Sequence, residues 1–343
     1  MLKRHHIMLL LAAVTLLPSL NARGQSAGAF SRMGFGARGI ALGNALVADV
    51  SGSASPYYNP ALAPFTSGQN LQVSVALLSF DRTLQFLQLA APLQQRAGFA
   101  VGLIHAAVSN IDGRDAGGFH TADLSIDEYA GFLVFGIRLG GRVTGGIGLQ
   151  MFRSDLSEGL KAVNSIGLDV GFTVKISEKT YLGLVLDDLL ARYTWDTSGL
   201  NGSGGKTTTD RFPLRMRIGL MRSFLEERLR LFAEYESRVS VLEHVSSSVG
   251  FLGDEPVQFT DRTRLTFQEN RFRFGAEYQI LEQISVRGGL EQLGADALEG
   301  VRPATGFMIE QTVGMLKARF EYAFALESQA SGMMHLLSLR LFL

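Results

Sequence analysis

Apolar and polar residues alternate one by one in many short stretches of this chain. Between residues 211 and 222, Leu214 and Met216 occupy alternate positions, and Arg215 and Arg217 occupy the positions next to them. Successive side chains of a β-strand point to opposite faces, whereas a helix would mix these two sets. Each stretch is about ten residues long, which is the length of a tilted strand that crosses a bilayer.

About fourteen such stretches follow one another along the chain, and short connections between them alternate with long polar ones. We expect strands at residues 69–80, 82–91, 96–108, 127–138, 142–153, 164–176, 179–188, 211–222, 228–238, 271–280, 283–290, 304–311, 314–325 and 334–343. The long connections include Ser109–Ile126, Leu189–Asp210 and Val239–Asn270, which we expect to be loops. Short turns alternating with long loops are typical of outer-membrane barrels. The sequence therefore predicts an all-β fold, a transmembrane antiparallel β-barrel of about 14 strands over residues 69–343.

The first residues have the composition of a secretory signal peptide. Lys3 and Arg4 precede an apolar run, Ile7–Leu17, and small residues follow before Gln25. The run is too short for a membrane anchor, which needs about 20 apolar residues. We expect residues 1–24 to be removed on export. A soluble two-sheet sandwich would also alternate, but it does not require an export signal followed by about fourteen strands of this length.

Composition excludes several functional classes. The chain has no Cys, so disulfides, thiolate metal sites and a cysteine nucleophile are ruled out. It has 32 basic and 32 acidic residues, without the basic excess expected of a nucleic-acid binder. The residues of Gly34–Gly39 match a dinucleotide motif, but no predicted strand precedes them. No catalytic set is recognisable, and the His residues lack metal-ligand spacing. We therefore expect neither an enzyme nor a bound cofactor or metal.

Residues 25–68 differ from the rest because they are rich in Gly, Ala and Ser and show no strand period. Ala37-Arg38-Gly39, Leu42-Gly43-Asn44 and Asn59-Pro60-Ala61 resemble the start of the PorV/PorQ family of outer-membrane proteins, itself similar to FadL-type transporters of hydrophobic compounds. Near the other end, Tyr322-Ala323-Phe324 followed by a short loop and a final strand is similar as well. Together these motifs bracket the barrel pattern.

The resemblance implies a bacterial outer-membrane barrel whose N-terminal segment, 25–68, folds into the lumen as a plug. The plug motif would consist of Arg38, Gly43, Asn59, Pro60 and Ala61. Two functions remain open. The chain could be an accessory of type IX protein secretion, with secretion subunits or exported cargo as partners. Alternatively, it could be a FadL-like passage for hydrophobic small molecules, opened by a shift of the plug.

The later strands carry charges on the face opposite their apolar side chains. Such charges need partners or water, because an isolated ion in a low-dielectric place costs several kcal/mol. They could form a polar conduit or an ion-pair ladder that stiffens the wall, and we favour the ladder. We expect Asp187 and Asp188, at a strand end, to be solvated loop acids. The expected lumen-facing charges are Arg215, Arg217, Glu234, Glu236, Arg271, Arg273, Glu277, Arg287, Arg319 and Glu321.

Overall fold

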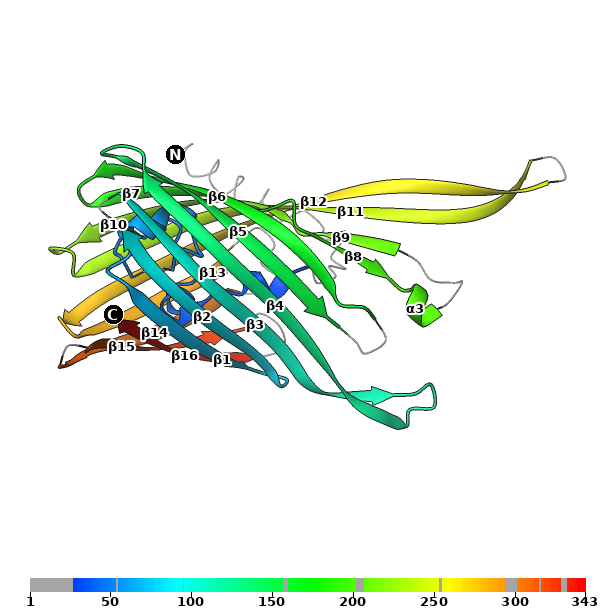
Figure 1. Ribbon diagram of the computed structural model, residues 1–343, viewed down its shortest axis with the longest axis horizontal. Helices are drawn as coiled ribbons and strands as arrows, with labels where there is room; N and C mark the ends of the chain where they lie inside the picture. Colours follow the sequence, from blue (N-terminus) through cyan, green and yellow to red (C-terminus); the bar gives the residue numbers. More distant parts are fainter. Residues whose placement is uncertain are drawn as a thin grey trace, which may run out of the picture.

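The computed structural model shows one closed antiparallel barrel of fourteen strands within the described part of the chain (Figure 1). The last strand, β16 (Met333–Phe342), pairs with the first, β1 (Asn70–Leu78), and so closes the wall. The predicted all-β barrel of about 14 strands is confirmed. The structure describes residues 27–343 apart from 54, 95, 157–159, 202–206, 253–254, 294–300, 315 and 328–331, with backbone only at 200–201, 242–252, 255–263 and 313. The expected signal peptide, residues 1–24, lies outside the described residues.

Every predicted strand overlaps one observed barrel strand. Consecutive barrel strands pair with one another, and β7 pairs with β10 because β8 and β9 form a separate two-stranded sheet. Between β1 and β16 the other barrel strands are β2 (Arg82–Leu93), β3 (Ala97–Arg114), β4 (His120–Arg138), β5 (Val143–Asp155), β6 (Val163–Ser177), β7 (Thr180–Leu189), β10 (Leu214–Phe224), β11 (Leu229–Leu252), β12 (Glu255–Leu281), β13 (Ile284–Leu293), β14 (Arg302–Val313) and β15 (Leu316–Leu326).

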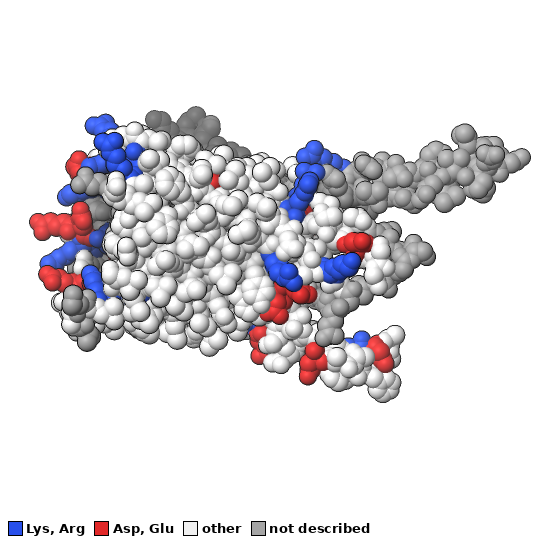
Figure 2. Space-filling view, viewed as in Figure 1, with Lys and Arg blue, Asp and Glu red and all other residues white. Residues whose placement is uncertain are grey.

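The two-residue period decides which side chains face outward. Along β10 exposed and buried residues alternate without a break. Outward-facing side chains such as Val73, Leu133 and Ile218 are 37–51% exposed. On the face shown in Figure 2, the result is a broad, almost uncharged band, flanked by charged residues at both ends of the barrel. An apolar band between two polar ends is the surface that lipid requires.

Two of the predicted loops are wrong, because the strands continue through them. Most of Ser109–Ile126 belongs to β3 and β4. All of Val239–Asn270 except its tip belongs to β11 and β12, which pair from Leu229 to Leu252 and form a ribbon that projects beyond the barrel (Figure 1). At about 3.3 Å per residue, β11 is about 80 Å long. Val, Ser, Thr and Phe recur in these segments, and β-branched and aromatic residues favour continued pairing over a loop.

The predicted loop Leu189–Asp210 is also only partly irregular. It contains β8 (Arg192–Asp196), the short helix α3 (Ser198–Asn201) and β9 (Thr207–Arg211). The two strands pair antiparallel, from Arg192 opposite Arg211 to Asp196 opposite Thr207. They form a small flap at the long-loop end of the barrel (Figure 1).

The described part of the N-terminal segment lies inside the barrel (Figure 1). It contains η1 (Ala29–Arg32), α2 (Gly36–Ala41) and η2 (Pro60–Phe65), most of whose residues are buried. Among the described residues, no helix has the length and apolar character needed to cross a membrane. We call residues 27–68 the plug. At Gly136 of β4 an added Cβ would lie 2.6 Å from the carbonyl oxygen of Pro60, so only glycine allows η2 to approach the wall this closely.

Candidate functional site

The barrel interior has two chemically different sides with the plug between them. Strands β10 to β13, β15 and β16 carry buried Arg and Glu side chains, whereas β2 to β5 carry buried aromatic and aliphatic ones. A lumen of this kind presents different surfaces to polar and to apolar solutes.

The charged side is a continuous network of ion pairs between neighbouring strands. Arg273 on β12 donates to Glu234 Oε1 at 2.8 Å and Glu236 Oε2 at 2.9 Å on β11, and its Nε lies 3.3 Å from Glu291 Oε1 on β13. All four side chains are at least nine-tenths buried. Each charge therefore has a partner across the strands, which corresponds to the ladder favoured from the sequence.

The plug is part of the same network. Arg38 on α2 donates from Nε to Glu277 Oε2 of β12 at 3.0 Å and also pairs with Asp49 of the plug. Burial lowers the pKa of Arg38, but the two carboxylates outweigh burial and leave it above its usual value. The backbone N–H of Val47 donates to Glu234 at 3.2 Å. Arg38 is therefore a permanent cation that ties the plug to the wall.

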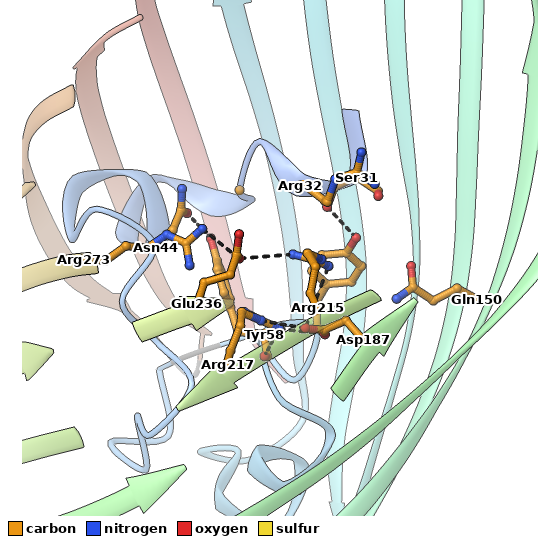
Figure 3. Close-up of a pocket in the computed structure, with 12 residues that line it drawn as sticks. Ser31, Arg32, Asn44, Tyr58, Gln150, Asp187, Arg215, Arg217, Glu236 and Arg273 are labelled. Atoms are coloured by element: carbon orange, nitrogen blue, oxygen red, sulfur yellow. Dashed lines mark hydrogen bonds and ion pairs between the residues drawn. The ribbon is translucent and has the colours of Figure 1, made fainter. Parts of the chain in front are cut away.

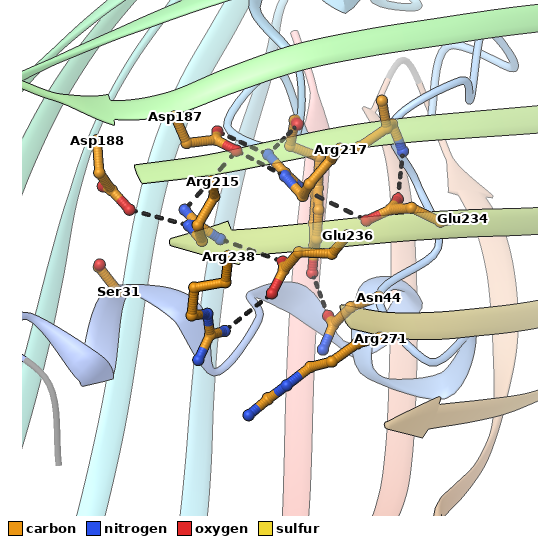
Figure 4. A network of polar contacts seen from close by, with 12 residues as sticks. Ser31, Asn44, Asp187, Asp188, Arg215, Arg217, Glu234, Glu236, Arg238 and Arg271 are labelled. Carbon is orange, nitrogen blue, oxygen red and sulfur yellow. Dashed lines mark hydrogen bonds and ion pairs between the residues drawn. The ribbon is translucent and has the colours of Figure 1, made fainter. Parts of the chain in front are cut away.

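Asp187 and Asp188 are not solvated, so that expectation is wrong. Both are buried, and Arg215 Nε donates to Asp188 Oδ2 at 2.9 Å while Arg217 Nε donates to Asp187 Oδ2 at 2.7 Å (Figure 4). Arg217 Nη2 also donates to the carbonyl of Tyr58 in the plug at 2.7 Å. The sequence carried part of this signal, because Asp187 continues the inward face of β7. Its register with Arg215 of β10 is seen only in the fold.

The structure places the predicted lumen charges at different depths. Eight are buried, with 0–7% of each residue exposed. Arg271 and Arg319 are half-buried and lie toward opposite ends of the wall, where they pair with Glu269 and Glu310 respectively. The buried eight are Arg215, Arg217, Glu234, Glu236, Arg273, Glu277, Arg287 and Glu321.

The predicted plug motif forms the contacts that hold the plug in shape. Asn59 caps η2, since its Oδ1 accepts from the backbone N–H of Ala61 at 2.9 Å, and Pro60 occupies the first turn. Asn59 Nδ2 also donates to the carbonyls of Val47, at 2.7 Å, and Phe172 of the wall, at 3.3 Å. Gly43 has a φ of 61°, and a Cβ there would lie 2.7 Å from the backbone of β13.

The apolar side begins with what we call the inner aromatic cluster, Phe35, Tyr57, Phe86 and Phe132. Phe86 and Phe132 come from β2 and β4, and their rings stack with centroids 6.0 Å apart. The plug contributes Phe35, which stacks on Phe86 at 5.4 Å, and Tyr57, which lies 5.1 Å from Phe132. Aromatic rings from wall and plug thus meet directly.

A second group, the outer aromatic cluster, lies at the long-loop end and consists of Phe30, Phe152, Tyr193, Trp195 and Phe212. Phe152 of β5 contacts Phe212 at 4.7 Å, and Phe212 contacts Tyr193 of β8 at 5.0 Å. Phe30 of η1 and Trp195 of β8 complete the cluster. The flap and the first turn of the plug therefore cover the apolar side.

A small cavity lies between the plug and the charged side of the wall, next to Tyr57 of the inner aromatic cluster. It has a volume of about 20 Å³ and lies between Ser31, Tyr58, Gln150 and the Arg215–Asp187 region (Figure 3). That is room for about one water molecule. Within the described ranges no group of three or more His, Asp or Glu side chains has the geometry of a metal site.

Comparison with known proteins finds solved structures of similar fold. No family model matches the chain, and no curated protein sequence matches it. The toluene transporter TodX of Pseudomonas putida matches with a TM-score of 0.59 and 14% identity over 90% of this chain and 96% of its own. The toluene transporter TbuX of Ralstonia pickettii matches at 0.57 and 14%, over 90% and 97%. A FadL homologue of Pseudomonas aeruginosa matches at 0.56 and 12%, over 90% and 98%.

These likenesses establish the architecture. The chain shares the fold of these three proteins, a closed antiparallel β-barrel of fourteen strands with an N-terminal segment inside. The likenesses extend over nine-tenths of the chain but give no support to the PorV/PorQ family in particular.

Proposed function

We propose that this protein lets hydrophobic small molecules cross the outer membrane. The observation that carries the proposal is the pair of aromatic clusters along one side of the lumen. The interior of an outer-membrane barrel is ordinarily polar. Aromatic side chains there offer an apolar solute a surface on which it is removed from water. TodX and TbuX, which share the fold, are toluene transporters, so small aromatic hydrocarbons are the solutes to test first.

The outer aromatic cluster is the proposed point of entry. Tyr193 and Trp195 belong to the flap, which is not hydrogen-bonded into the barrel wall as a strand. Displacing the flap would expose Phe152 and Phe212 without breaking the pairing of any two barrel strands. From there the inner aromatic cluster continues the apolar surface, while the charged side keeps the rest of the plug in place.

The proposal is tested by uptake of radiolabelled toluene. Cells that produce the protein should accumulate toluene faster than cells without it, and Phe132→Asn should slow this uptake by about tenfold, because an amide facing the path adds a polar group that an apolar solute cannot satisfy. Phe119→Asn is the matched control, since Phe119 is 74% exposed in the turn between β3 and β4. Equal uptake with and without the protein would contradict the proposal.

The projecting β11–β12 ribbon favours a second candidate, the PorV/PorQ-type accessory of type IX secretion. A membrane-spanning strand needs about 9–11 residues, whereas β11 and β12 have 24 and 27. The excess forms a long two-stranded surface outside the barrel that a secretion subunit or an exported cargo protein could contact.

Removing residues 242–263 separates the two candidates. If the protein is a passage for hydrophobic molecules, the shortened barrel should still take up toluene at the parental rate. If it serves secretion, cross-linking followed by affinity capture should retrieve secretion subunits or cargo with the parent and lose them with the shortened protein.

A further inference from the structure

A second, larger cavity lies at the short-turn end of the barrel. Its volume is about 410 Å³, and it is separate from both aromatic clusters. Strands β11 to β16 and the plug surround it, and four cationic side chains line it, Arg230, Arg287, Lys317 and Arg319. In outer-membrane barrels the short turns face the periplasm. The cavity therefore opens toward the periplasm.

The four cations form a gradient from the rim to the floor. The exposed fraction of the side chain falls from 45% at Lys317 to 22% at Arg230, 12% at Arg319 and 1% at Arg287. An anion entering from the periplasm would first meet a solvated ammonium group and then guanidinium groups that are progressively less hydrated. Three carboxylates, Glu277, Glu282 and Glu310, also line the cavity, so its lining carries one more positive than negative charge.

The carboxylates of the cavity do not use all the donors of these cations. Glu277 is shared by three guanidinium groups, because Arg38, Arg230 and Arg287 all donate to it. Arg287 also donates from Nη2 to Glu321 at 3.0 Å, but its Nη1 is buried and has no hydrogen-bond partner among the described residues. The hydroxyl of Ser51, which lines the same cavity, is likewise buried without a described partner.

Unused donors of this kind are costly unless something accepts from them. A buried donor without an acceptor destabilises the fold, and more so when it is charged. An oxyanion supplies several acceptor oxygens and matches the planar donors of arginine. Beside the cations, the ring of Phe342 lies 5.3 Å from Lys317 Nζ and 5.2 Å from Arg319 Cζ, so part of the wall is also apolar.

We propose that this cavity binds a small oxyanion, a carboxylate or a phosphate, on the periplasmic side of the plug. The cavity is large enough for a compact molecule, and three of the cations that line it, Lys317, Arg230 and Arg319, keep part of their side chains exposed. Phe342 would accommodate an aromatic or short aliphatic group attached to a carboxylate. The proposal does not depend on hydrophobic transport, since neither aromatic cluster takes part.

The test is calorimetric titration of the purified, folded barrel with three probes. Sodium benzoate carries a carboxylate on a ring, inorganic phosphate is an oxyanion without a ring, and toluene has the ring without the charge. We expect benzoate or phosphate to bind, and the double variant Lys317→Gln/Arg319→Gln to weaken that binding at least about tenfold, as loss of charged hydrogen bonds does. Whichever of the two binds more tightly identifies the source of the oxyanion.

Lys175→Gln is the matched control. Lys175 lies at the same end of the barrel, where it pairs with Glu178 at 2.6 Å as Lys317 pairs with Glu310 at 2.7 Å, but it does not line the cavity. It should leave anion affinity within about twofold of the parent. A folded barrel migrates faster on a gel than the same protein unfolded by heat. A difference in mobility between the unheated and heated samples therefore verifies that each variant is folded. The proposal would be overturned if neither anion bound, or if Lys175→Gln lost as much anion affinity as the double variant, whatever the result with toluene.

Discussion

A disulfide between the plug and the wall is expected to stop hydrophobic uptake. In Val47→Cys/Gly219→Cys, the new Cβ at Gly219 would lie 3.2 Å from that of residue 47, close to the separation of about 3.5–4.5 Å found across disulfides. The parent has no Cys, so no other pairing competes. Oxidation would tie the plug to β10.

The reason for the expected loss is the lack of space between the plug and the inner face of β7 and β10. The cavity there has a volume of about 20 Å³, which is too small for a molecule of the size of toluene. Passage therefore requires a second, minor arrangement in which the plug has shifted, and a state of this kind is typically populated at about 0.1–10%. A covalent tie that excludes it should lower toluene uptake at least about tenfold. A reductant should restore the uptake.

Two controls make the experiment decisive. Each single Cys variant, oxidised in the same way, should transport as the parent does. The second control is the reductant, which should return oxidised Val47→Cys/Gly219→Cys to the parental rate of uptake. If the disulfide forms on gels and uptake persists, the hydrophobic molecules pass without movement of this part of the plug, and the hypothesis of a shifting plug fails for that segment.

The barrel could be predicted because each membrane-spanning strand has a recognisable pattern in its own short stretch of sequence. In β10 and β16 the two-residue period alone shows which residues face lipid. The same period underlies the antiparallel closure between β1 and β16, since each has one apolar outer face. The ends of the strands could not be predicted as well. Outside the membrane no lipid enforces the apolar face, so the pattern fades while backbone pairing in β11 and β12 continues.

The interior was only partly predictable, because the period gives a face and not a partner. The period placed Glu277 on an inner face and the family resemblance placed Arg38 in the plug motif, but their contact joins residues 239 positions apart. The outer aromatic cluster was not foreseen for a similar reason. Tyr193 and Trp195 lie in a segment that we expected to be a loop, and only the folded flap brings them onto Phe212.

Arg273→Met is expected to destabilise the barrel strongly. The substitution keeps much of the side-chain volume but removes the cation that Glu234, Glu236 and Glu291 share. Removing one partner of a buried ion pair typically costs about 3–5 kcal/mol, because the remaining charges are left uncompensated. Other guanidinium groups of the network lie near these acids, including Arg217 Nη1 at 3.9 Å from Glu234, so we expect a loss toward the lower end of that range.

Urea unfolding of the protein in lipid vesicles measures this loss, with the fluorescence of the single Trp, Trp195, and the gel mobility of unheated samples as two readouts. Arg114→Met is the control, since it removes an arginine from an exposed pair with Asp112, where water replaces the partner and stability should hardly change. Adding Glu234→Gln to Arg273→Met should recover part of the loss, because it removes one of the stranded charges. If Arg273→Met proved as stable as Arg114→Met, the buried network would not be what holds plug and wall together, and the aromatic contacts would have to supply that cohesion.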